Sequence, residues 1–208
     1  MFTSDNGGLS TAEGSPTSNL PLRAGKGFLY EGGIRVPLVV RWPGIVKPGT
    51  TTAVPVTTLD IAATLLDVGG AKQPAETVLD GTSLRPVLAG GVLPVKEVCR
   101  DLCWHYPHYS NQGGRPAAAI IAGDGASQGT EKLGTEKLVE HFEDGRVELF
   151  DLATDPGERR DLAAERPERA AALKERLSAW RIGVGAAMPS PNPQPVDPFG
   201  PDGEPRKR

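Results

Sequence analysis

The stretch LRAGKGFLYEGGIRVPLVVRWPG, residues 22–44, has closely spaced glycines in its first part and ends in an apolar run. The closing run, PLVVRWPG, predicts a short buried strand built on the β-branched Val39 and Val40, which a Pro-Gly pair ends. Glu31 and Arg35 stand four residues apart around two glycines and can form an internal ion pair that fixes the loop. We favour that structural role for the pair over a catalytic one.

Lys26 lies in the same stretch between two glycines, whose small size lets the backbone approach a bound group closely. Its ammonium group is a compact positive charge with three donors, which suits a tetrahedral oxyanion. The sequence therefore makes Lys26 a candidate anion-binding residue, with an ordinary solvated loop lysine as the alternative.

Upstream, the chain opens with MFTSDNGGLS, in which a stub of strand at Phe2 and Thr3 precedes Asp5 and Asn6. A carboxylate and an amide oxygen are hard donors for Ca²⁺ or Mg²⁺, and ligands of open α/β sheets gather at the carboxyl ends of strands. Asp-Asn-Gly-Gly is also ordinary turn chemistry, and two ligands fall short of the about six that such an ion takes. Both a metal site and a simple turn stay open.

Downstream, VTTLDIAATLLDVGG (56–70) predicts a helix capped by Thr58, and DGTSLRPVLAGG (80–91) predicts a loop leading into one or two helical turns. The helix carries an apolar stripe, made of Leu59, Ala62, Leu65 and Leu66.

A second block begins near residue 95. EKLVEHFEDGRVELFDL (136–152) alternates in polarity on both sides of an Asp-Gly turn, which predicts a β-hairpin. PERAAALKERLSAWRIG (167–183) predicts an amphipathic helix that begins at a proline and turns Leu173, Leu177 and Trp180 to one face. The tandem repeat GTEKLGTEKL (129–138) is interpreted as a duplication in a loop, without an assigned function.

The segment LCWHYPHYSNQGG (102–114) gathers aromatic rings around His105 and His108. A proline between the two histidines prevents them from facing one metal as helical neighbours, so a zinc pair is disfavoured. His105 is a candidate substrate-binding residue, since an imidazole donates or accepts near neutral pH, with half-buried packing as the alternative. Cys99 and Cys103 are too few for a disulfide framework.

Composition narrows the classes of partner. The 208 residues have a formal net charge of −3, which gives no reason to expect nucleic acid or an anionic membrane surface. No apolar run approaches the about 18 residues that span a bilayer. No secretory signal is visible, and the location of the protein stays unknown.

These segments, taken in order, resemble the sulfatase family, within the alkaline-phosphatase-like superfamily. The resemblance covers roughly residues 2–188, corresponds to the C-terminal part of a sulfatase, and is most specific in LRAGKGFLYEGGIRVP. Its other supports are FTSDNGG, TTLDIAATLLD, DGTSL, WHYPHY and DPGE.

The resemblance implies an α/β fold, in which a remnant of the catalytic sheet is followed by a small α+β subdomain with an antiparallel sheet and a helix. We expect the sheet remnant in residues 1–94, the subdomain in 95–188 and an unstructured proline-rich tail in 189–208.

By position, the resemblance implies that Asp5 and Asn6 bind the active-site Ca²⁺ or Mg²⁺ and that Lys26 contacts the substrate sulfate and supports departure of the alcohol. It places His105 at the border of the substrate pocket, and it makes the pair of Glu31 and Arg35 a scaffold around the lysine.

The family's nucleophile is a formylglycine made in a C/S-x-P-x-R sequence, which neither Cys99 nor Cys103 begins, and the first pair of metal aspartates is missing as well. The chain is therefore expected to start partway through an active site, to be inactive alone and only marginally stable, and to have an upstream chain with the N-terminal half as a candidate partner. Family members are often exported.

The leading interpretation is thus part of a hydrolase of carbohydrate or aryl sulfate esters. The alternatives are a phosphate or phosphonate ester hydrolase of the same superfamily, and a non-catalytic module that binds a sulfated glycan or a partner chain.

Overall fold

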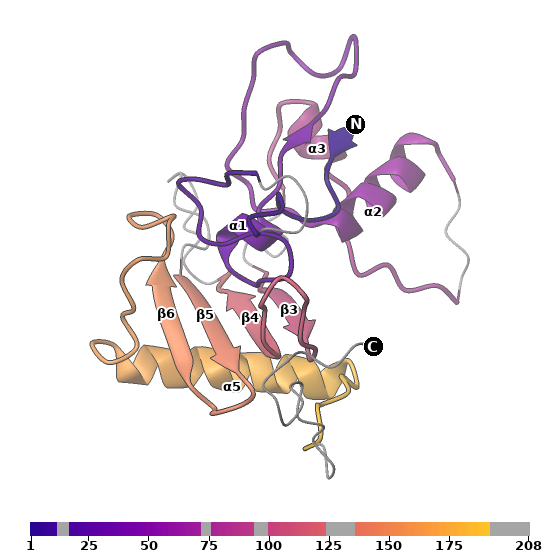
Figure 1. The fold of residues 1–208 in the computed structure, drawn as a ribbon. Helices are drawn as coiled ribbons and strands as arrows, with labels where there is room; N and C mark the ends of the chain where they lie inside the picture. The colour runs from indigo at the N-terminus through magenta and orange to yellow at the C-terminus, as the bar shows by residue number, and fades with distance from the viewer. Residues whose placement is uncertain (12–16, 72–75, 94–99, 124–135, 192–208) are drawn as a thin grey trace, which may run out of the picture.

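A four-stranded antiparallel sheet organises the C-terminal part of the chain in the computed structural model, which describes residues 1–11, 17–71, 76–93, 100–123 and 136–191. Its strands follow one another in space as they do in the sequence, and Figure 1 shows α5 crossing the sheet. The strands and the helix are β3 (Leu102–Tyr106), β4 (Ala117–Ile121), β5 (Glu136–His141), β6 (Val147–Asp151) and α5 (Pro167–Gly183).

Helix α5 covers one face of this sheet through an apolar stripe. Leu173 and Leu177 are fully buried against Ile120 and Leu138 of the strands, and Trp180 packs at the edge of the same cluster. Proline stands at the first turn, where a missing N–H costs nothing. The predicted helix, its start and its apolar face are confirmed.

The opposite face of the sheet receives the N-terminal half of the chain. Val139 and Phe150 are buried there, and Leu29 and Tyr30 pack on them just before the short helix α1 (Glu31–Ile34). The glycine-rich stretch that contains Lys26 is thereby anchored to the C-terminal sheet, since Leu29 lies three residues further along the chain.

The predicted hairpin is confirmed as β5 and β6, joined through Gly145 at φ +70°, a conformation that glycine adopts without strain. Glu136, Lys137 and Leu138, the last residues of the tandem repeat, lie inside β5. The interpretation of the repeat as loop is therefore wrong for these three residues, because their alternation continues that of the strand. Residues 124–135 fall outside the described ranges.

The N-terminal half contains only a two-stranded antiparallel sheet, β1 (Phe2–Thr3) with β2 (Leu38–Val39). The strand predicted around Val39 is present but is not buried, since Val39 is 58% exposed and Phe2 67%. Within the described ranges β2 pairs with no strand besides β1, so both strands expose apolar side chains to solvent. The fold of the described residues is therefore mixed α/β, with two small antiparallel sheets and helices.

Helix α2 (Thr58–Val68) begins one residue earlier than expected, with Thr57 rather than Thr58 as its N-cap. The carboxylate of Asp60 decides this, because it accepts the Thr57 N–H at 2.7 Å in a capping box. Asp60 is fully buried and also accepts the Thr82 N–H at 2.8 Å, which ties the following loop to the helix. That loop leads into helix α3 (Arg85–Leu88), the predicted single turn.

The apolar stripe of α2 is exposed, since Leu59 is 54% and Leu65 58% accessible to solvent. The buried face instead consists of Asp60, Ala63 and Thr64, because these side chains meet the loop that precedes α3. The helix is thus correctly predicted, whereas the face it buries is not.

Several of the remaining sequence expectations concern residues outside the described ranges. No helix within the described residues is long and apolar enough to cross a membrane. Cys99, the expected domain boundary at 94/95 and residues 192–208 of the expected tail lie outside the described ranges. Cys103 is a half-buried free thiol, and burial raises its pKa to about 12.

Candidate functional site

The loop after β1 is bent sharply and is held by hydrogen bonds within the loop and to the backbone of α1. The Ser4 hydroxyl donates to the carbonyl of Asn6 at 2.8 Å, and the Gly7 N–H donates to the carbonyl of Gly33 at 2.9 Å. A Cβ atom at Gly7 would lie 1.7 Å from the carbonyl oxygen of Gly32, so only glycine fits. Asp5, in the same loop, is exposed.

The Lys26 loop is fastened directly to this first loop. The Lys26 N–H donates to the carbonyl of Gly8 at 3.1 Å, and the Asn19 side chain bridges both loops. Asn19 accepts the Gly8 N–H at 3.1 Å and donates both to the Gly8 carbonyl at 2.8 Å and to the Ala24 carbonyl at 3.0 Å. The backbone segments that carry Asp5, Asn6 and the exposed Lys26 are therefore neighbours, although about twenty residues separate them in the sequence.

A third segment, the connection between β3 and β4, closes around Gly27. The Ser110 hydroxyl donates to the Gly27 carbonyl at 3.3 Å, and a Cβ atom at Gly114 would lie 1.8 Å from that same carbonyl oxygen. Gln112 is buried against Gly27. Asn19, Ser110 and Gln112 could not be identified from the sequence, because no local pattern marks a loop residue for a contact with a distant glycine.

His105 does not join these three loops. It pairs with Ala118 in the register of β3 and β4, on the face that α5 covers, and its ring lies 5.4 Å from that of Phe142. Its Nε2 is 2.8 Å from the carbonyl of Ala187. The neighbouring Trp104 is the side chain that faces the N-terminal half. A substrate-binding role for His105 stays a prediction.

Glu31 and Arg35 form the predicted ion pair at 3.8 Å, and Arg35 is largely exposed. The stronger partner of Glu31 is Lys137, whose ammonium group lies 2.9 Å from the Glu31 carboxylate and is fully buried. Glu31 is thus held by an interior charge that lies 106 residues away in the chain, and the role of the Glu31–Arg35 pair as a scaffold around Lys26 stays a prediction.

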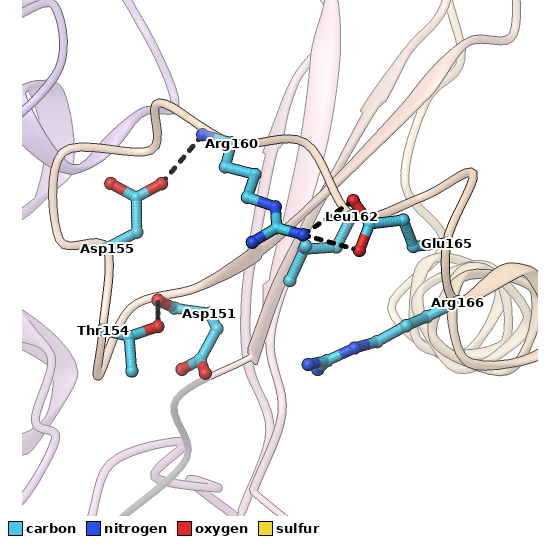
Figure 2. Close-up of a pocket in the computed structure, with 7 residues that line it drawn as sticks. All are labelled: Asp151, Thr154, Asp155, Arg160, Leu162, Glu165 and Arg166. Carbon is cyan, nitrogen blue, oxygen red and sulfur yellow. Dashed lines mark hydrogen bonds and ion pairs between the residues drawn. The ribbon is translucent and has the colours of Figure 1, made fainter.

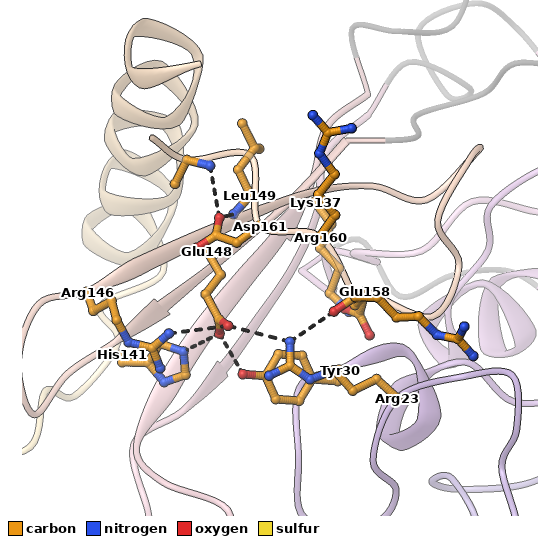
Figure 3. Close-up of polar contacts among 12 residues, drawn as sticks. Arg23, Tyr30, Lys137, His141, Arg146, Glu148, Leu149, Glu158, Arg160 and Asp161 are labelled. Carbon is orange, nitrogen blue, oxygen red and sulfur yellow. Dashed lines mark hydrogen bonds and ion pairs between the residues drawn. The ribbon is translucent and has the colours of Figure 1, made fainter. Parts of the chain in front are cut away.

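A second polar cluster flanks the Lys26 stretch, and Figure 3 shows it converging on the carboxylate of Glu148. The Tyr30 hydroxyl donates to Glu148 at 2.5 Å, and His141 Nε2 lies 2.7 Å from the same oxygen. The guanidinium of Arg23 stacks 3.7 Å above the Tyr30 ring, and that of Arg146 lies 3.2 Å from the carboxylate. Burial, followed by the bond to Glu148, raises the pKa of the Tyr30 phenol.

Because of this cluster, we expect the protein to lose measurable stability in acid. Burial by itself would raise the pKa of Glu148, but the hydrogen bonds from His141 and Tyr30 and the nearby guanidinium groups outweigh it and lower the pKa from 4.5 to about 2. Because the unfolded chain takes up this proton first, the stabilisation is complete above about pH 4.5 and is lost as the pH falls toward 2. It amounts to about 3 kcal/mol.

Urea unfolding of the wild type, Glu148→Gln and Glu175→Gln between pH 6 and pH 2 checks this expectation. Glu148→Gln is expected to lack that part of the acid loss, whereas Glu175, an exposed residue of α5, serves as the matched control. Identical pH profiles for all three proteins would contradict the role of Glu148.

Two hollows lie on the C-terminal side of the molecule. The smaller hollow has a volume of about 120 Å³, and its charged lining residues bind one another. Figure 2 shows that Asp155 accepts the Arg160 N–H and that Arg160 pairs with Glu165. The larger, of about 570 Å³, runs beside Arg23 and Glu158 on the flank of the Lys26 stretch.

The donors for a cation are incomplete within the described residues. Asp5 and Asn6 supply hard oxygen atoms of the type that Ca²⁺ and Mg²⁺ prefer, which fits such an ion in kind. However, no group of three or more His, Cys, Asp and Glu side chains in the described ranges could hold a metal. The oxygen donors here fit as part of a site.

Comparison with known proteins gives one consistent match. The family model described as N-sulphoglucosamine sulphohydrolase, C-terminal, matches residues 24–182. A protein named sulfatase from Formosa agariphila is 36% identical over an alignment of 190 residues that covers 88% of this chain and 32% of that protein. The chain thus spans about a third of the length of this curated relative.

Two solved structures share the fold. The protein BT4656, in complex with its substrate D-glucosamine-2-N,6-O-disulfate, aligns with a TM-score of 0.65 and 26% identity over 86% of this chain and 33% of its own. The phosphonate monoester hydrolase SpPMH from Silicibacter pomeroyi aligns with a TM-score of 0.55 and 25% identity over 76% of this chain and 31% of its own.

Proposed function

Because the chain belongs to the sulfatase family, we propose that it supplies cation-binding and sulfate-binding side chains to the active site of a sulfate ester hydrolase. Asp5 and Asn6 are the proposed ligands of the cation, and Lys26 is the proposed contact to the sulfate group. The observation that carries the proposal is the direct hydrogen bond from the Lys26 N–H to the Gly8 carbonyl, which joins the two loops that bear these residues.

The chemistry of sulfuryl transfer explains why these residue types are needed. As in phosphoryl transfer, negative charge spreads over the peripheral oxygen atoms, so fixed positive charge lowers the barrier. In our proposal the Lys26 ammonium group binds those oxygens and supports departure of the alcohol, while the Asp5 carboxylate and the Asn6 amide hold part of the coordination sphere of Ca²⁺ or Mg²⁺. The cation, when bound, withdraws charge from the sulfate oxygens.

The nucleophile and the other metal ligands are outside this sequence, which contains no C/S-x-P-x-R segment. We propose that they come from the polypeptide that corresponds to the first two thirds of the sulfatase fold. That polypeptide together with this chain is called the assembled enzyme below, and the chain by itself is expected to be inactive. In this assignment residues 1–94 extend the alkaline-phosphatase-like catalytic domain and residues 95–188 form its subdomain.

A sulfated carbohydrate is the proposed substrate class, with aryl sulfates as the alternative. The support is the similarity to BT4656, whose substrate is a disulfated glucosamine. The similarity to a phosphonate monoester hydrolase favours a second candidate, a phosphate or phosphonate ester, because sulfate and phosphate esters are similar tetrahedral anions.

Turnover of 4-nitrophenyl sulfate, 4-nitrophenyl phosphate and a phenyl phosphonate ester by the assembled enzyme tests the proposal. We expect the sulfate ester to be hydrolysed with the highest kcat/KM. A higher value for the phosphorus esters would establish the second candidate. Binding of a sulfated sugar without turnover of any ester would contradict both and favour a non-catalytic module.

A further inference from the structure

The interior of the molecule contains a charged trio that the proposed reaction does not use. Lys137 projects from β5 on the same face as its cross-strand partner Phe150, toward α1, and is fully buried. Its ammonium nitrogen lies 2.9 Å from the Glu31 carboxylate and 2.8 Å from that of Glu158. Both glutamates are also buried, so one lysine pairs with two interior acids, one at the start of α1 and one in the loop before α5.

Glu158 holds the Lys26 stretch at both of its ends. Its side-chain oxygen accepts the Glu31 N–H at 2.7 Å, and its backbone carbonyl accepts from the Arg23 guanidinium at 3.1 Å. It does so from a left-handed conformation at φ +52°, which is strained for a residue with a Cβ. Glu158 therefore forms hydrogen bonds with both the first and the last residue of the stretch 23–31, and Lys26 lies between them.

The loop between these two hydrogen bonds packs directly on α1. A Cβ atom at Gly32 would lie 2.3 Å from the Arg23 carbonyl oxygen, and one at Gly33 would lie 2.0 Å from that of Phe28. The two glycines thus leave no gap between α1 and the loop, and any shift of Glu31 displaces the backbone around Lys26.

We propose that Lys137 is a positioning residue for Lys26, acting through Glu31 and Glu158 to hold the loop 23–31 in the place from which the ammonium group of Lys26 meets an anionic ester. That Lys26 meets an anionic ester rests on the proposed function, whereas the fixing of the loop by Lys137 does not.

Stability alone does not account for the trio. Replacing buried ion pairs by apolar residues of similar volume is often neutral or stabilising, because desolvation of the charges offsets their attraction. The excess negative charge adds to this cost, and burial raises the pKa of Glu158. What the trio provides is a fixed relation between the sheet and two loops far apart in the sequence.

Hydrogen exchange on the full chain tests the inference, with Lys137→Met compared with Lys174→Met. Methionine keeps the length of the side chain without its charge, and Lys174 is an accessible lysine on α5 that pairs with Glu140. In Lys137→Met we expect at least about tenfold faster exchange of the Lys26, Phe28 and Gly32 amides, with β4 and α5 unchanged. Lys174→Met is expected to match the wild type throughout.

Two results would overturn the inference: unchanged exchange in residues 23–33, or equally faster exchange across the whole sheet, which would make Lys137 a general stabiliser. If Lys137→Met does not fold, Glu158→Gln replaces it, because glutamine keeps an acceptor for Glu31 but loses the charge, and the same local acceleration is expected.

Inorganic sulfate added to the same samples separates this inference from the proposed function. In the wild type we expect sulfate to slow exchange in the loop 23–31, and we expect about tenfold weaker sulfate binding in Lys137→Met. If sulfate leaves the wild type unaffected while Lys137→Met still exchanges faster in this loop, the positioning role stands and the sulfate site is refuted.

Discussion

Lys26→Met is expected to lower kcat of the assembled enzyme for sulfate ester hydrolysis by about 10²–10³-fold, the usual effect of removing one charged donor from a developing oxyanion. The ammonium group is proposed to bind the peripheral oxygens and to assist departure of the alcohol, so its contribution grows in the transition state. The loss should therefore appear in kcat more than in KM. Steady-state kinetics with 4-nitrophenyl sulfate measure both.

The chain offers a matched control for this substitution. Lys47 is an exposed lysine in a loop of the same half, and Lys47→Met removes the same charge from elsewhere on the surface. We expect Lys47→Met to retain the wild-type kcat. Equal activities for the two variants would refute a catalytic contact by Lys26.

Gly7→Ala is expected to detach the first loop from α1 and to destabilise the protein by about 3 kcal/mol, at the upper end of overpacking effects. The new methyl group would lie 1.7 Å from the carbonyl oxygen of Gly32, which is rigid backbone. Relief of this clash would break the hydrogen bond from the Gly7 N–H to Gly33 and would displace the loop that carries Asp5. Urea unfolding measures the loss of stability.

Gly183→Ala is the control for this substitution. A Cβ atom at Gly183, at the end of α5, would meet no other atom within 4 Å. Alanine is the better helix former, so this variant should be unchanged or more stable by up to about 1 kcal/mol. A Gly7→Ala protein as stable as the wild type would contradict the close packing of the two loops.

The elements with strong local signals could be predicted from the sequence alone. Asp144 and Gly145 between two alternating runs determine the hairpin, and Pro167 followed by the spacing of Leu173 and Leu177 determines α5. These signals are sufficient because a turn or an amphipathic helix depends on residues a few positions apart.

Predictions about burial failed where a distant element decides the outcome. The apolar stripe of α2 satisfies the helical spacing, but the loop that binds Asp60 packs on another face, so Leu59 and Leu65 are exposed. His105 is half-buried on the face that α5 covers, as its alternative interpretation allows, while the alternation of β3 turns Trp104 toward the N-terminal half.

In the candidate site, too, residues in local patterns could be recognised from the sequence, whereas residues that act through distant contacts could not. Short glycine-rich patterns make Lys26, Asp5 and Asn6 candidates, the resemblance to the sulfatase family supplies their expected roles, and the structure places their backbone segments side by side. The residues that hold these segments could not be predicted, because Lys137 meets Glu31 across 106 residues and Asn19 joins the loops from an ordinary polar stretch.

Both loops are proposed to meet one anionic group, and a crystal structure of the assembled enzyme with Ca²⁺ and sulfate would show whether they do. We expect a Ca²⁺ ion within about 2.3–2.6 Å of oxygens from both Asp5 and Asn6, and a sulfate oxygen about 3 Å from Lys26 Nζ. A structure in which the Asp5 carboxylate and the Lys26 ammonium group point to opposite sides of the protein, with neither touching an ion, would contradict this proposal.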